Sequence, residues 1–83
     1  MITRQQAQQW LLKEIDREIK ERGEDYIYMC SPMPCKNSWT LAEYKKAVNN
    51  DECLENAHNP IDDVMQYEKY MQERGLKGLE DEL

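Results

Sequence analysis

The sequence has no phenylalanine, three glycines and few β-branched residues. Sandwiches and barrels draw heavily on β-branched and aromatic side chains, so this shortage argues against an all-β fold. No apolar run approaches the roughly 20 residues that a membrane span needs. The first residues, MITRQQAQQ, lack the charged-then-apolar order of a signal peptide, so we expect a cytoplasmic protein. A phosphate-binding glycine loop is also excluded, because glycine occurs only at positions 23, 75 and 78.

The residues that are abundant favour helices. Gln, Glu, Lys, Leu, Met and Ala make up much of the 83-residue chain, and all of them have high helix propensity. The length allows one small domain, whose single core supplies only ~3–5 kcal/mol. We therefore predict a mainly α protein in which residues 1–83 form one domain.

Two longer amphipathic helices are predicted, at about 4–22 and 60–74. In the first, Thr3 and Gln6 have the spacing of a capping box, and Gly23 follows the last turn. In the second, Asn59 is a good N-cap and Pro60 occupies the first helical position. Both segments repeat apolar residues at helical spacing, which indicates one buried face each.

A third, short helix is predicted at about 41–49. Thr40 and Glu43 repeat the capping-box spacing, and Asn49 to Asp51 tolerate the turn geometry that ends a helix. Isolated helices of this length are marginal in water, so packing must hold it.

The segment between the first two helices changes character. Residues 26–29 alternate in a way that predicts one short strand at most, followed by a loop containing Pro32, Pro34 and Cys35. A lone strand has no ladder partner, so residues 26–29 either form irregular loop or pair with another chain. The acidic tail, 76–83, is expected to fray.

Positive charge is missing from a long stretch. The net charge is -6, and no Lys or Arg occurs from Ala47 to Glu68. This balance argues against direct binding of nucleic acid or of an anionic membrane, and favours a protein partner with a basic surface. The alternative is an ordinary solvated acidic face. We call the six carboxylates of this stretch the acidic belt: Asp51, Glu52, Glu55, Asp62, Asp63 and Glu68.

Four aromatic residues are candidate anchors for such a partner, because Trp and Tyr are enriched at binding hot spots. They are Trp10, Tyr26, Tyr28 and Trp39. Trp10 lies roughly 140° from the middle of the apolar stripe of its helix, so it needs a second contact surface. That surface is either the following loop or a partner.

The cysteines and the single histidine lie close together in the sequence, as Cys30, Cys35, Cys53 and His58. Three thiolates and one imidazole form a suitable tetrahedral ligand set for a structural zinc ion, although the usual spacing between paired cysteines is shorter. The alternatives are small apolar packers and loop residues, or an oxidised Cys30–Cys35 pair. A Cys/His nucleophile pair would need a local signature that is absent, so we expect no enzyme and no cofactor beyond this hypothetical zinc.

The leading hypothesis is a non-enzymatic, acidic interaction module or inhibitor that docks a basic surface of a larger protein, in the manner of a small host antagonist. One alternative is a homo-oligomer that binds a small ligand where its chains meet, with the lone strand and exposed aromatics at the seam. The other is a structural module that zinc holds together.

Overall fold

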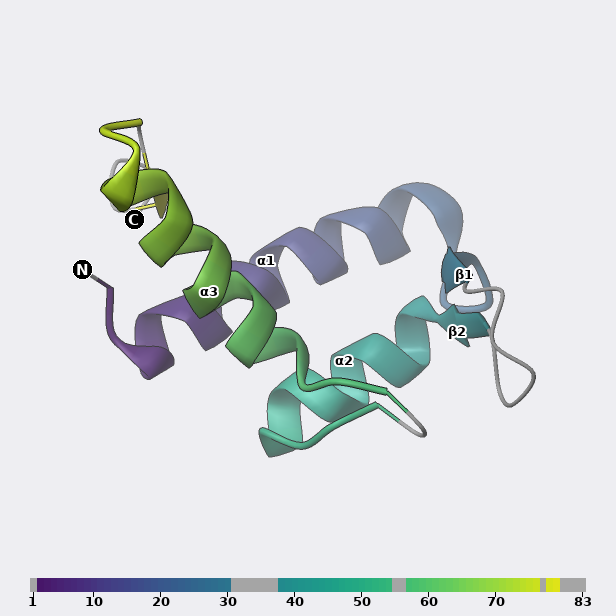
Figure 1. Ribbon diagram of the computed structural model, residues 1–83. Coiled ribbons are helices and arrows are strands. Elements are labelled where there is room, and N and C mark those ends of the chain that lie inside the picture. Colours follow the sequence, from purple (N-terminus) through teal and green to yellow (C-terminus); the bar gives the residue numbers. More distant parts are fainter. Residues whose placement is uncertain (1, 31–37, 55–56, 77, 80–83) are drawn as a thin grey trace.

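Three helices and a two-stranded hairpin make up the part of the chain that the structure describes (Figure 1). The structure is a computed structural model, and it describes residues 2–30, 38–54, 57–76, 78 and 79, without the side chains of 29 and 30. The predicted small, mainly α fold is confirmed. The elements are, in chain order, α1 (Arg4–Arg22), β1 (Ile27–Cys30), β2 (Ser38–Thr40), α2 (Leu41–Asn50) and α3 (Pro60–Glu73).

Both predicted capping boxes are present. At the start of α1, Thr3 Oγ1 accepts from Gln6 N at 3.1 Å, and Gln6 Oε1 accepts from Thr3 N at 2.9 Å. At the start of α2, Thr40 Oγ1 accepts from Glu43 N at 3.2 Å and Glu43 Oε1 accepts from Thr40 N at 3.1 Å. Each box satisfies backbone N–H groups that have no partner inside the helix, which fixes where the helix begins.

The remaining helix ends also match their sequence signals. Asn59 Oδ1 accepts from Ile61 N at 2.9 Å and so caps α3. Helix α1 ends at Gly23, whose φ of 91° is accessible to glycine at little cost. Helix α2 ends at Asp51, which adopts the left-handed conformation with φ 50°.

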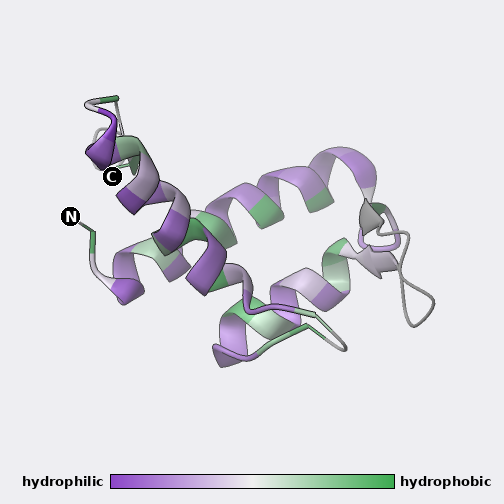
Figure 2. Ribbon diagram, viewed as in Figure 1, coloured by the Kyte–Doolittle hydropathy of each residue, from purple (hydrophilic) through white to green (hydrophobic). Residues whose placement is uncertain are grey.

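The core lies where α2 and α3 pack against α1. Ile15, Leu41 and Ile61, one from each helix, are fully buried, and truncating any of them to alanine should cost about 2–5 kcal/mol. In Figure 2 the apolar residues form narrow bands on helices that are otherwise hydrophilic. The buried apolar residues are Ile2, Ala7, Leu11, Ile15, Trp39, Leu41, Tyr44, Ala47, Val48, Leu54, Ile61 and Leu79.

The hairpin corrects the expectation of at most one strand. β1 pairs with β2 in antiparallel register, with Ile27 opposite Thr40 and Cys30 opposite Ser38, and the ladder is irregular just after Ile27. The strand therefore finds its partner within its own chain. β2 has three residues, too few to show an alternating pattern, and its last residue also caps α2.

The hairpin is joined to α2 through the backbone. Leu41 N donates to Tyr26 O at 3.0 Å, and Ala42 N donates to Glu24 O at 3.1 Å. These two N–H groups belong to the first turn of α2, where no intrahelical acceptor exists. The chain around Tyr26 thus completes the start of a helix that follows it in sequence.

Glu68 holds the chain beyond α3. Its side chain is 1% exposed, and its carboxylate accepts from Leu79 N at 2.6 Å and from Gln72 Nε2 at 3.1 Å. Leu79 is buried in the core, so the expectation of a frayed tail is wrong for this residue. A buried carboxylate needs such donors, because an unpaired one would be very costly. Residues 77 and 80–83 lie outside the described part of the chain.

We predict that Gly78→Ala destabilises the fold. A Cβ at position 78 would collide with the Glu68 carboxylate, and overpacking of this kind costs about 1–3 kcal/mol. The free energy of unfolding in urea measures the cost. In a Glu68→Ala background the obstacle is gone, so the same glycine substitution should cost less there. Equal costs in the two backgrounds would contradict this role for Glu68.

Candidate functional site

The acidic belt has a counter-charge that the sequence does not reveal. Arg4, at the start of α1, donates from Nε and Nη2 to the two carboxylate oxygens of Asp51, at 2.8 and 2.5 Å. Its Nη1 donates to Asp62 Oδ1 at 2.5 Å. The planar guanidinium thus makes a two-pronged contact with one carboxylate and a single contact with the next. The prediction of carboxylates without counter-charge is wrong for Asp51 and Asp62.

This ion-pair cluster connects the three helices, because Asp51 ends α2 and Asp62 lies in the first turn of α3. The hydrogen bonds from Arg4 and then from Asn59 Nδ2 (3.1 Å) lower the pKa of Asp51 to about 2. The hydrogen bonds to Asp51 and then to Asp62 raise the pKa of Arg4. The cluster is solvent-exposed, so its role is to orient the helix ends.

The rest of the belt is divided among several roles. His58 Nδ1 lies 2.7 Å from Asp63 Oδ2, and Glu68 is buried beneath the chain beyond α3. The Glu68 carboxylate accepts from Leu79 N and from Gln72 Nε2, so this member of the belt is not available to a partner. Glu52 is exposed and has no cationic partner among the described residues, and Glu55 lies outside them. Within the described part of the belt, Glu68 is buried, whereas Asp51, Glu52, Asp62 and Asp63 are exposed.

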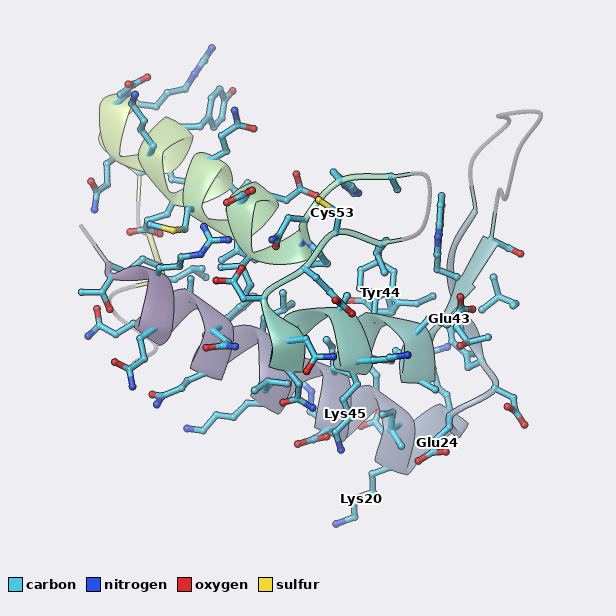
Figure 3. The ribbon with its side chains drawn as sticks, turned by 90° about the horizontal axis from the view of Figure 1, so that it is seen from below. Lys20, Glu24, Glu43, Tyr44, Lys45 and Cys53 are labelled. Atoms are coloured by element: carbon cyan, nitrogen blue, oxygen red, sulfur yellow. The ribbon has the colours of Figure 1, made fainter. Side chains whose placement is uncertain are left out.

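The structure describes two of the four side chains of the hypothetical zinc site, those of Cys53 and His58. Cys35 and the side chain of Cys30 lie outside the described part of the chain. Cys53 is an exposed free thiol on the connection between α2 and α3 (Figure 3), and His58 faces Asp63. Among the residues that the structure describes, no three His, Cys, Asp or Glu side chains are grouped so that they could hold a metal ion.

The four predicted anchors fall into two groups. Trp39 is 3% exposed and belongs to the core, so its place on a docking surface is corrected. Trp10 is partly buried and packs against the core margin. Tyr26 and Tyr28 are 43% and 40% exposed, as a docking surface requires.

Tyr26 and Tyr28 stand on either side of Ile27, which is 44% exposed and which the sequence prediction missed. Three large side chains in a row are therefore open to solvent, an arrangement typical of interaction sites when they are contiguous. The alternation of residues 26–29 predicted that Ile27 lies on the opposite side of the strand from Tyr26 and Tyr28. The irregular ladder just after Ile27 breaks that alternation.

Each of the two tyrosine rings contacts a side chain of a neighbouring helix. The Tyr28 ring lies 4.9 Å from the Tyr44 ring, centroid to centroid, at 54°. Arg22 Nη1 donates to Tyr26 Oη at 3.1 Å, and the guanidinium lies 4.8 Å from the centroid of the Tyr26 ring. Burial, followed by the nearby Glu18, raises the pKa of Tyr28, and burial raises that of Tyr44 to about 12, so both rings remain neutral phenols near pH 7.

Exposed acidic residues precede this hydrophobic strip in the sequence. Four neighbouring charges are paired within α1, as Glu14 with Arg17 and Glu18 with Arg22, and Asp16 pairs with Lys45 of α2 at 2.9 Å. Three carboxylates have no ion pair among the described residues. We define the hairpin surface as the strip together with these three: Tyr26, Ile27, Tyr28, Glu21, Glu24 and Asp25.

No described helix is long and apolar enough to cross a membrane.

Acid should weaken the fold through Asp51. Its pKa is about 2 in the folded protein against ~3.9 in an unfolded chain. The stabilisation is thus present above pH ~4 and is lost as the pH falls towards 2. We expect Asp51→Asn to lower the urea midpoint of unfolding at about pH 5. Between about pH 5 and pH 2.5 the midpoint should then fall less in this variant than in the wild type. Glu52→Gln, a neighbouring control, should keep the wild-type acid sensitivity; the same sensitivity in Asp51→Asn would refute the assignment.

Comparison with known proteins adds no assignment to this geometry. No protein-family model matches the chain, and no curated protein or solved structure matches it. Function must therefore be inferred from the side chains themselves.

Proposed function

We propose that this protein is a non-enzymatic interaction module that docks a basic segment of a larger protein through the hairpin surface. The observation that carries the proposal is the exposure, by 40% or more, of three consecutive large side chains, Tyr26, Ile27 and Tyr28. Exposed apolar side chains in a group, next to polar ones, are typical of protein-interaction sites. We place this activity in the cytoplasm, where an exposed free thiol such as Cys53 would stay reduced.

The charge of the surface defines the partner. Glu21, Glu24 and Asp25 are exposed just before the strip in the sequence. The nearby cations without an ion pair among the described residues are Lys20 and Lys46, and Lys46 lines the same hollow as Glu24. A segment with Lys or Arg on either side of an apolar residue matches this pattern. Its cations would also be attracted to the faces of Tyr26 and Tyr28. Charges at the rim mainly accelerate association. The strip, which becomes buried when the partner binds, determines how long the complex lasts.

The strip is well suited to binding because its side chains lose little freedom on docking. Tyr26 is already held by Arg22, and Tyr28 already lies on Tyr44. Side chains that are ordered beforehand reduce the entropy cost of association. An inhibitor role follows if the basic segment belongs to an active groove of the partner.

The test starts from a display library of short random peptides, with the chain as bait. Peptides that bind should combine Lys or Arg with an aromatic or aliphatic residue. Tyr26→Ser and Ile27→Ser should weaken their binding tenfold or more, the loss of a hot-spot side chain. Raising the salt concentration from about 0.05 to 0.5 M should weaken binding further, because the rim charges become screened.

Two matched controls separate this surface from other regions. Glu52→Gln alters the acidic belt, and Tyr67→Ser alters a tyrosine on α3 that is more exposed than Tyr26 or Tyr28. Both should bind the selected peptides as the wild type does, and circular dichroism should show the same helix content in every variant. Selection of acidic peptides, or a loss of binding in Glu52→Gln equal to that in Ile27→Ser, would overturn the proposal.

A further inference from the structure

The outward face of α3 has a second aromatic surface, separate from the hairpin surface. Asp63, Tyr67, Tyr70 and Arg74 follow one another at intervals of four, three and four residues, the spacing of a coiled-coil seam. All four are exposed, the two tyrosines by 55% and 50%. We call them the α3 stripe. The side of α3 that carries Ile61 and Glu68 is buried, so the helix already has its contact with the core.

The stripe lies beside a shallow hollow that is open to solvent. Its tyrosines border a hollow of about 490 Å³. The hollow is open to solvent, so it is accessible to an aromatic ring from outside. The residues that line it are Asp63, Gln66, Tyr67, Lys69, Tyr70 and Glu73. In knobs-into-holes packing each helix supplies both the ring that enters and the hollow that receives it.

The order of charges along the stripe makes it complementary to itself. Asp63 stands four residues before Tyr67, and Arg74 stands four residues after Tyr70. If two such helices meet antiparallel about a two-fold axis, Tyr67 of each copy meets Tyr70 of the other. Each end of the stripe then meets an opposite charge. Antiparallel helices also oppose their dipoles favourably.

The end groups are positioned for such a pairing. The Arg74 guanidinium lies 4.8 Å from the centroid of its own Tyr70 ring, so it lies along the stripe. Asp63 contacts His58 through Oδ2, and its Oδ1 has no hydrogen-bond partner among the described residues. Arg74 has no ion pair within the same ranges. A parallel arrangement would place like charges together at both ends.

We propose that two copies of this chain associate through antiparallel α3 stripes. Tyr67 of each copy then packs against Tyr70 of the other, and Asp63 of each pairs with Arg74 of the other. The helix has 14 residues, about 21 Å in length, so the contact is smaller than a standard stable interface. We therefore expect a reversible dimer with a Kd on the order of 10⁻⁴ M. This association does not involve the hairpin surface.

The experiment is sedimentation of the full chain from about 10 µM to 1 mM, with two charge-reversal variants. Asp63→Arg places arginine opposite arginine, and Arg74→Asp places aspartate opposite aspartate, so each variant alone should associate at least tenfold more weakly than the wild type. A one-to-one mixture of the two restores both ion pairs and should form a heterodimer. Tyr70→Ser should also weaken association, whereas Ile27→Ser should not.

Each outcome decides the proposal, and circular dichroism first verifies that the variants retain their helices. A wild-type chain that remains monomeric at 1 mM overturns it, as does a dimer that neither charge variant weakens. Two variants that both fail to associate, alone and mixed, overturn the antiparallel register. Loss of peptide binding without loss of the dimer would reject only the function proposed for the hairpin surface.

Discussion

The packing of α2 and α3 against one side of α1 is the constraint on which the rest of the structure depends. In the part of the chain that the structure describes, the buried apolar residues form one small core, in which Ile15, Leu41 and Ile61 are fully buried. Because those positions are fixed, the start of α1 lies beside the end of α2 and the start of α3. Arg4 can reach both Asp51 and Asp62 only in this arrangement. The ion-pair cluster is therefore a result of the helix packing, and it in turn helps to orient the helix ends.

The helices could be predicted from the sequence because their signals are local. A capping box needs two residues three positions apart, and Thr3 with Gln6 or Thr40 with Glu43 meets that condition. The pattern of buried residues along α1 follows from helical geometry in the same way. Each predicted helix boundary agrees with the structure to within one residue.

The rest depends on contacts between distant residues, which one sequence does not show. Arg4 and Asp51 are separated by 47 positions, and Leu79 reaches Glu68 beyond the glycine at 78. For the site, exposed Tyr26 and Tyr28 agreed with expectation, whereas Trp39 entered the core and Ile27 was missed. A tryptophan preceding an N-cap packs inward against its own helix, as a hydrophobic staple does. Residue type alone does not distinguish such a tryptophan from a docking residue.

The backbone bonds from Leu41 and Ala42 to Tyr26 and Glu24 have a consequence for local motion. Opening the hairpin would remove acceptors from the first turn of α2, so the strip and the helix belong to one cooperative unfolding unit. A partner that immobilises the strip would therefore slow hydrogen exchange at those two amides, although they lie on a different element. Occupation of the hairpin surface would thus be transmitted along the backbone into the core.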